Sequence, residues 1–142
     1  MSLPPLVIQT AGSLAAILVL AGLAHLLRLG GTPRLASDDA VRRAAGEVED
    51  GFAPVTTACD AEGASAIARD DAGRIMVIKR HGNRFAGRVL GPAASARVEH
   101  NRGEFNLIVD PGEARFGKVF LTIADAEAWA AAINRLSRPQ DA

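Results

Sequence analysis

The chain has 142 residues, the size of one compact domain, and its 16 Lys and Arg residues balance 16 Asp and Glu residues. The charges are unevenly placed, because residues 1–27 carry none of them. This division excludes a wholly disordered chain, a fully cytosolic globular protein and a strongly basic nucleic-acid binder. The single cysteine, Cys59, excludes an intrachain disulfide and a zinc site built from cysteines.

An apolar segment at residues 6–27 predicts a transmembrane helix within an anchor region at 1–28. At about 1.5 Å per residue, the segment would be about 33 Å long, close to the thickness of the hydrocarbon core of a bilayer. A cleaved signal peptide would have a basic region before a shorter apolar run, and no basic residue precedes this one. We therefore expect an anchor that is not cleaved.

Basic residues flank the apolar segment on its C-terminal side only, beginning with Arg28 and Arg34. Lys and Arg residues next to a membrane span are retained in the cytoplasm. We therefore expect a bitopic protein of the bacterial inner (plasma) membrane, with its N-terminus outside and its C-terminal domain cytoplasmic. A lone unpaired cysteine suits the reducing cytoplasm.

After a linker at residues 29–36, a short amphipathic helix is predicted within 37–51. Ser37 is suited to cap its N-terminus. Apolar residues then recur at i, i+3, i+4 and i+7, which places them on one helical face: Val41, Ala44, Ala45 and Val48. We expect this face to dock on the domain that follows.

From Phe52 onward, short alternating runs are separated by turn residues every ~8–12 positions, a pattern typical of an antiparallel β meander. We expect seven strands, near residues 54–59, 64–69, 74–80, 84–90, 95–100, 104–109 and 117–123. A C-terminal helix is predicted at 125–136, with Asp125 as its N-cap and a tail at 138–142. Its apolar face would bury Trp129 as a core anchor, against strands that supply Phe120 or Phe105.

Seven meandering strands followed by one amphipathic helix that carries the only tryptophan, Trp129, resemble a pleckstrin-homology-like (PH-like) domain over residues 52–137. The resemblance implies an α+β domain in which two sheets form a split barrel and the C-terminal helix plugs an open end. The helix within 37–51 is an addition to that pattern. The whole chain is similar to small bacterial proteins that join one membrane helix to such a domain.

Basic residues concentrate at 74–88, where five Lys and Arg residues stand without an acidic one. A two-residue turn at Gly82-Asn83 would place four side chains on one face of a hairpin. These are Lys79, His81, Arg84 and Arg88. PH-like domains often bind phospholipid head groups through basic hairpins, so the resemblance implies a contact with anionic lipid or a partner here. The alternative is a solvated face whose charges balance acids elsewhere.

Catalytic motifs are missing from the sequence. Cys59 with His81 or His100 is a conceivable nucleophile and base, but a lone cysteine flanked by apolar residues is more often a buried hydrophobe. We expect no enzyme activity, no cofactor and no metal, and the few aromatic residues argue against stacking on nucleic acid. The expected function is a protein-binding or assembly module that contacts another membrane protein. The alternative is anionic-lipid head-group binding through the hairpin 74–88.

Overall fold

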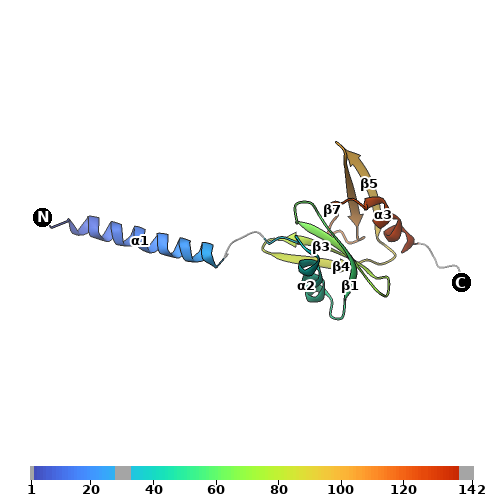
Figure 1. The fold of residues 1–142 in the computed structure, drawn as a ribbon, viewed down its shortest axis with the longest axis horizontal. Helices are drawn as coiled ribbons and strands as arrows, with labels where there is room; N and C mark the ends of the chain where they lie inside the picture. The colour runs from blue at the N-terminus through green and yellow to red at the C-terminus, as the bar shows by residue number, and fades with distance from the viewer. Residues whose placement is uncertain (1, 28–32, 138–142) are drawn as a thin grey trace. The chain divides into compact units, whose positions relative to one another are not determined.

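The structure is a computed structural model that describes residues 2–27 and 33–137 of the chain. The chain divides into two compact units, Met1–Thr32 and Pro33–Ala142 (Figure 1). The first unit holds helix α1 (Pro5–Leu26). Within its described residues, 33–137, the second holds two helices and seven strands: α2 (Asp38–Val48), β1 (Pro54–Cys59), β2 (Ser65–Asp70), β3 (Ile75–His81), β4 (Arg84–Val89), β5 (Ser95–Asn101), β6 (Glu104–Asp110), β7 (Val119–Thr122) and α3 (Ala126–Arg135).

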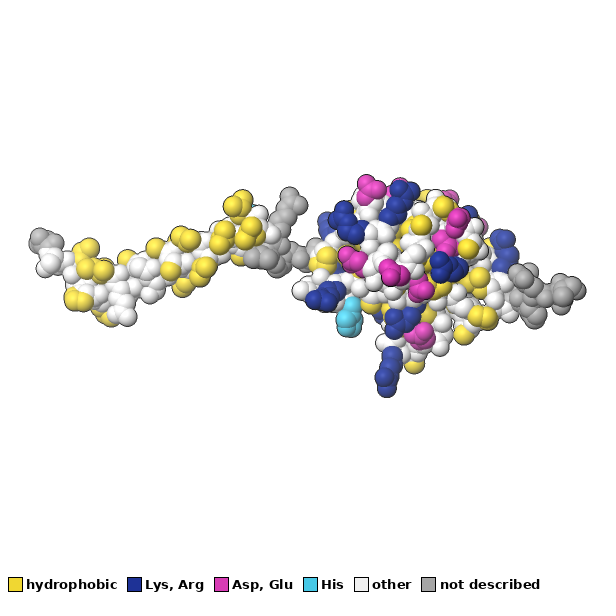
Figure 2. Space-filling view, turned by 90° about the horizontal axis from the view of Figure 1, so that it is seen from below, with side chains coloured by type: hydrophobic (Ala, Val, Ile, Leu, Met, Phe, Trp, Pro, Cys, Tyr) yellow, Lys and Arg dark blue, Asp and Glu magenta, His cyan; other side chains and the backbone are white. Residues whose placement is uncertain are grey.

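Helix α1 is long and apolar enough to cross a membrane, with 22 residues and a mean hydropathy of 2.1. Its bounds lie within one residue of the segment predicted at 6–27. Figure 2 shows hydrophobic side chains along its visible surface and no charged ones. The hydroxyl of Thr10 donates to the carbonyl of Leu6 (2.8 Å), so this polar side chain is satisfied within the helix. A membrane anchor and a signal sequence share these properties.

Helix α2 begins as predicted, because the backbone N–H of Ala40 donates to Ser37 Oγ (3.2 Å). The predicted apolar face is also confirmed, since Val41, Ala44 and Ala45 are buried. These residues pack on one face of the sheet β1-β2-β3-β4 (Figure 1), together with apolar side chains from that sheet and its flanking segments. The cluster so formed contains Leu35, Val41, Ala44, Ala45, Phe52, Ala66, Ala68, Met76 and Ile78.

Strands β2 and β3 are buried on both faces. Ala66, Ala68, Met76 and Ile78 point toward α2, whereas Ile67, Ile75 and Val77 point the other way, into a second core cluster. The second cluster is completed by the sheet β5-β6-β7 and by α3. The C-terminal unit is therefore layered, with the four-stranded sheet between α2 on one side and the three-stranded sheet and α3 on the other.

The predicted meander is confirmed, and each strand lies within two residues of its predicted bounds. Both sheets are antiparallel throughout and both remain open in the described part of the chain. Polar contacts join them at the edge of β7. The N–H of Thr122 donates to Asp60 Oδ1 (2.7 Å), and Ser65 Oγ donates to the carbonyl of Phe120 (2.6 Å). The split barrel that the resemblance implies is not confirmed, because neither sheet closes within the described residues.

Helix α3 places Trp129 in the second core cluster, with 7% of its surface exposed. The predicted partners Phe120 and Phe105 are wrong, since they are 62% and 40% exposed. Phe120 lies between two inward-facing residues of β7 and therefore points outward. Phe105 stacks on His100 (ring centroids 4.7 Å apart), the residue opposite it on β5. The phenylalanine that does join the cluster of Trp129 is Phe116.

The predicted capping role of Asp125 is also incorrect. Asp125 directly precedes α3, but its side chain makes no capping hydrogen bond. Its backbone has φ −94° and ψ 33°, outside the extended region in which a capping side chain reaches the next turn. The tail predicted at 138–142 lies outside the described residues.

Candidate functional site

The hairpin β3–β4 has the register predicted from its turn. His81 pairs with Arg84 and Lys79 pairs with Ala86, on either side of Gly82 and Asn83. Gly82 has φ +65°, a backbone conformation that glycine adopts without a steric penalty. Because directly paired residues share a face, Lys79, His81, Arg84 and Arg88 lie on the same face of the hairpin. The predicted juxtaposition is confirmed.

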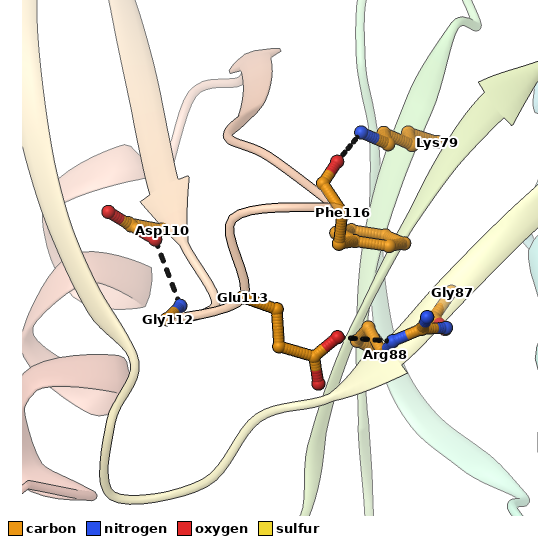
Figure 3. Close-up of polar contacts among 7 residues, drawn as sticks. All are labelled: Lys79, Gly87, Arg88, Asp110, Gly112, Glu113 and Phe116. Carbon is orange, nitrogen blue, oxygen red and sulfur yellow. Dashed lines mark hydrogen bonds and ion pairs between the residues drawn. The ribbon is translucent and has the colours of Figure 1, made fainter.

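The segment between β6 and β7 crosses this face and inserts the ring of Phe116. Lys79 Nζ lies 4.4 Å from the centre of the ring, and the guanidinium carbon of Arg88 lies 4.9 Å from it. The Lys79 amino group also donates to the carbonyl of Phe116 (Figure 3). Both cations are therefore held against the same aromatic ring, an arrangement that positions them and contributes about 0.5–1 kcal/mol each at exposed sites.

Arg88 has a second set of contacts. Its Nε donates to Glu113 Oε2 (2.7 Å), and its NH1 donates to the carbonyl of Gly87 (2.9 Å), as Figure 3 shows. About half of each side chain of the Arg88–Glu113 pair is exposed. Water screens such a pair, so its contribution to stability is at most about 1 kcal/mol. The contacts of Arg88 therefore fix its direction more than they stabilise the unit.

These residues enclose a shallow cleft of about 210 Å³ between the hairpin and the segment after β6. We call it the basic cleft. Its lining side chains are Lys79, His81, Ala86, Arg88, Arg115 and Phe116. Glu113 is the acidic neighbour, through its contact with Arg88. Four basic or titratable side chains thus converge on a cleft with an aromatic wall, a combination suited to an anionic group.

The remaining basic residues of the hairpin region lie elsewhere. Arg74 is paired with the buried carboxylate of Asp70 (2.6 Å), and its guanidinium lies over the ring of Phe52. Arg80 points to the opposite face and donates to the carbonyl of Pro33 (2.9 Å). Arg84 lies at the exposed tip and has no polar partner among the described residues. The charge run read from the sequence is therefore divided among several surfaces.

Arg115 is the basic residue of the cleft that sequence reasoning missed, and the aromatic residue next to it, Phe116, was missed as well. It stands 27 positions after Arg88, in a segment with no helical or strand periodicity. The sequence signal that points to it is local: Arg115 and Phe116 lie side by side in the connection between the strands predicted at 104–109 and 117–123. Only the tertiary fold brings this connection over the hairpin.

Cys59 lies in β1 and His100 in β5, so this conceivable nucleophile and base belong to different sheets. Burial, and the negative charge of Asp38, raise the pKa of the Cys59 thiol, which opposes the thiolate form of a nucleophile. Cys59 packs against the cluster beneath α2, whereas His100 stacks on Phe105 in the other sheet. Within residues 2–27 and 33–137, no group of His, Cys, Asp and Glu side chains could hold a metal ion. No protein-family model, curated protein or solved structure matches the chain.

Proposed function

We propose that the chain is a single-pass membrane protein whose C-terminal unit is a non-catalytic, PH-like binding module. Helix α1 would be the anchor, and Arg28 and Arg34 would hold the module in the cytoplasm. The order of a four-stranded sheet, a three-stranded sheet and a C-terminal helix supports the PH-like assignment. The buried Trp129 on that helix supports it as well.

The observation that carries the binding function is the basic cleft. Ligand pockets for small molecules usually have volumes of about 300–1,000 Å³. At about 210 Å³, the basic cleft is better matched to one carboxylate-bearing side chain of a partner than to a whole metabolite. Lys79 and Arg88 are already positioned by Phe116, so little side-chain entropy would be lost on binding. We propose an acidic segment of another membrane protein as the occupant.

Anionic-lipid head groups are the second candidate ligand. The exposed tip residue Arg84 favours this possibility, because it lies outside the basic cleft and is not paired within the described residues. A guanidinium group in this position can reach a phosphate from the side of the hairpin tip.

The test uses the full chain, purified from native membranes with the proteins that accompany it. Arg115→Glu reverses a charge that lines the basic cleft, and Arg102→Glu is a matched control on the β5–β6 turn. We expect Arg115→Glu to weaken a specific partner complex roughly fivefold, equivalent to about 1 kcal/mol. The control should leave it unchanged. Equal loss in both variants, or loss in neither, would contradict the assignment.

A further inference from the structure

Arg88 of the basic cleft already holds an internal carboxylate. Its Nε donates to Glu113 Oε2 (2.7 Å) and its Nη1 donates to the carbonyl of Gly87 (2.9 Å), whereas Nη2 has no partner among the described residues (Figure 3). A carboxylate binds a guanidinium group most strongly through two parallel hydrogen bonds from neighbouring nitrogens. On either side of Nη2, a partner's carboxylate would therefore have to share a nitrogen with a group that Arg88 already contacts.

Of the two groups, the carboxylate of Glu113 is the one that can leave. The Gly87 carbonyl belongs to the backbone of β4, whereas the Glu113 side chain is about half exposed and is held by Arg88 alone among the described residues. The backbone of Glu113 is fixed, because its carbonyl accepts from the N–H of Gly117 (3.0 Å). Release of the carboxylate therefore requires a rotation of the side chain and no movement of the segment between β6 and β7.

The other basic side chains of the cleft differ from Arg88 in this respect. Lys79 Nζ donates to a backbone carbonyl, which leaves two of the three donors of its ammonium group. Arg115 and His81 line the cleft and have no polar partner among the described residues. These three side chains can bind an entering carboxylate without displacing an internal group. Arg88 is therefore the cleft residue at which a ligand and the protein's own acidic side chain compete.

We propose that Glu113 is an internal competitor for the basic cleft, and that its carboxylate occupies the place on Arg88 that a partner's carboxylate takes on binding. The exchange replaces one arginine–carboxylate pair by another, so Arg88 adds to the affinity only the difference between the two pairs. Freeing Arg88 from Glu113 should strengthen binding roughly fivefold, equivalent to about 1 kcal/mol, the upper value for an exposed ion pair. The inference rests on the proposed function, because it concerns the same cleft and the same class of ligand.

The experiment measures how tightly the full chain, in a non-ionic detergent, binds a short peptide of glutamates with blocked ends. The dissociation constant is obtained from the NMR shifts of the backbone amides of Arg88 and Arg115 during titration. We expect Glu113→Gln, which removes the competing charge, to bind this probe roughly fivefold more tightly than the unaltered protein. Glu99→Gln is the matched control, because Glu99 is also about half exposed and pairs with an arginine, Arg97 (3.2 Å), on β5. It should leave the affinity unchanged.

A second variant separates competition from a general effect of charge. Glu113→Asp keeps the negative charge but shortens the side chain by one methylene group, which weakens its contact with Arg88. Competition predicts that this variant binds the probe more tightly than the unaltered protein, whereas a charge effect alone predicts equal binding. The carbon-13 signal of the Glu113 carboxylate reports the exchange directly. It should move toward the position of a solvated glutamate as the probe binds, and the signal of Glu99 should not.

The outcomes distinguish this inference from the proposed function. Probe binding that leaves the Glu113 signal in place would overturn the inference, and so would equal affinities for the unaltered protein and Glu113→Gln. Either result would leave the basic cleft as a site for acidic segments. Failure of the probe to bind any of these proteins would instead contradict the proposed function, and the inference with it.

Discussion

Asn134 on α3 satisfies both backbone groups of Ala96 on β5. Its Oδ1 accepts from the N–H of Ala96 (2.9 Å), and its Nδ2 donates to the carbonyl of Ala96 (2.9 Å). Strand β5 is an edge of the three-stranded sheet, where backbone groups would otherwise face outward. The side-chain amide thus takes the place of one residue of a neighbouring strand. It also ties α3 to the sheet whose core face the helix covers.

Replacing Asn134 by Ala should destabilise the C-terminal unit by about 1–2 kcal/mol, because two hydrogen bonds of about 0.5–1.5 kcal/mol each are lost at an exposed position. The fluorescence of Trp129, the only tryptophan, reports this unfolding in the full chain. For a unit of this size we expect the melting temperature to fall by roughly 4–8 °C per kcal/mol. Asn134→Asp keeps the acceptor oxygen and loses the donor, so its melting temperature should lie between those of the unaltered protein and Asn134→Ala. Equal melting temperatures for all three proteins would contradict this role of Asn134.

The local elements could be predicted from the sequence because each depends on residues close together in the chain. Ser37 and the apolar residues after it define α2, and Gly82-Asn83 defines the register of β3–β4. The alternation of side chains along a strand likewise involves only neighbouring residues, and it places Val119 and Leu121 on the inner face of β7.

Relationships between distant segments could not be predicted in this way. The contact of Phe116 with Lys79 and Arg88 depends on how the segment after β6 crosses the hairpin. The expectation that Phe120 packs on Trp129 followed residue type, although the alternation of β7 directs Phe120 outward. Only the part of the basic cleft that the hairpin β3–β4 forms could therefore be predicted from the sequence.

Trp129 should carry a large share of the stability of the second core cluster. Trp129→Ala removes a nearly fully buried aromatic side chain, a change that costs about 3–5 kcal/mol. Hydrogen exchange at the amides of β2 and β3 should become much faster in this variant, and Trp129→Phe should have a smaller effect. In the unaltered protein, Trp129 should emit at shorter wavelengths than free indole in water. Emission like that of free indole would show that α3 does not cover the sheet.

Gly87 should tolerate no side chain, because α2 approaches β4 closely at this position. A Cβ atom at Gly87 would lie 2.9 Å from Val48 Cγ2 and 3.0 Å from Val48 Cγ1. Valine has few alternative rotamers, so α2 would have to shift. We expect Gly87→Ala to lower stability by about 1–3 kcal/mol. Adding Val48→Ala should recover part of this loss, measured as the urea midpoint of Trp129 fluorescence. Gly46→Ala, where a Cβ meets nothing within 4 Å, is the control.

Asp70 should make the stability of the C-terminal unit depend on acidic pH. Burial of the carboxylate raises its pKa, but hydrogen bonds from Arg74 and the positive charge of Arg74 outweigh this, so the net pKa of Asp70 is lowered. Arg74 Nε lies 2.6 Å from Asp70 Oδ2, and the N–H of Arg74 donates to Oδ1 (2.8 Å). An unfolded chain binds this proton at a pKa of about 3.9. The stabilisation is therefore fully present above that value and is lost as the pH falls through the lower, folded-state pKa.

Asp70→Asn isolates this contribution, since the amide keeps an oxygen for Arg74 and cannot ionise in this range. At neutral pH the variant should be less stable than the unaltered protein. The gap between their urea midpoints should narrow as the pH falls from about 5 to below 3, a range that brackets the unfolded pKa. Asp71→Asn, one residue along and exposed, should show no such narrowing. A constant gap across this range would mean that Asp70 stabilises the β2–β3 turn through its shape and hydrogen bonds alone, with no contribution from its charge.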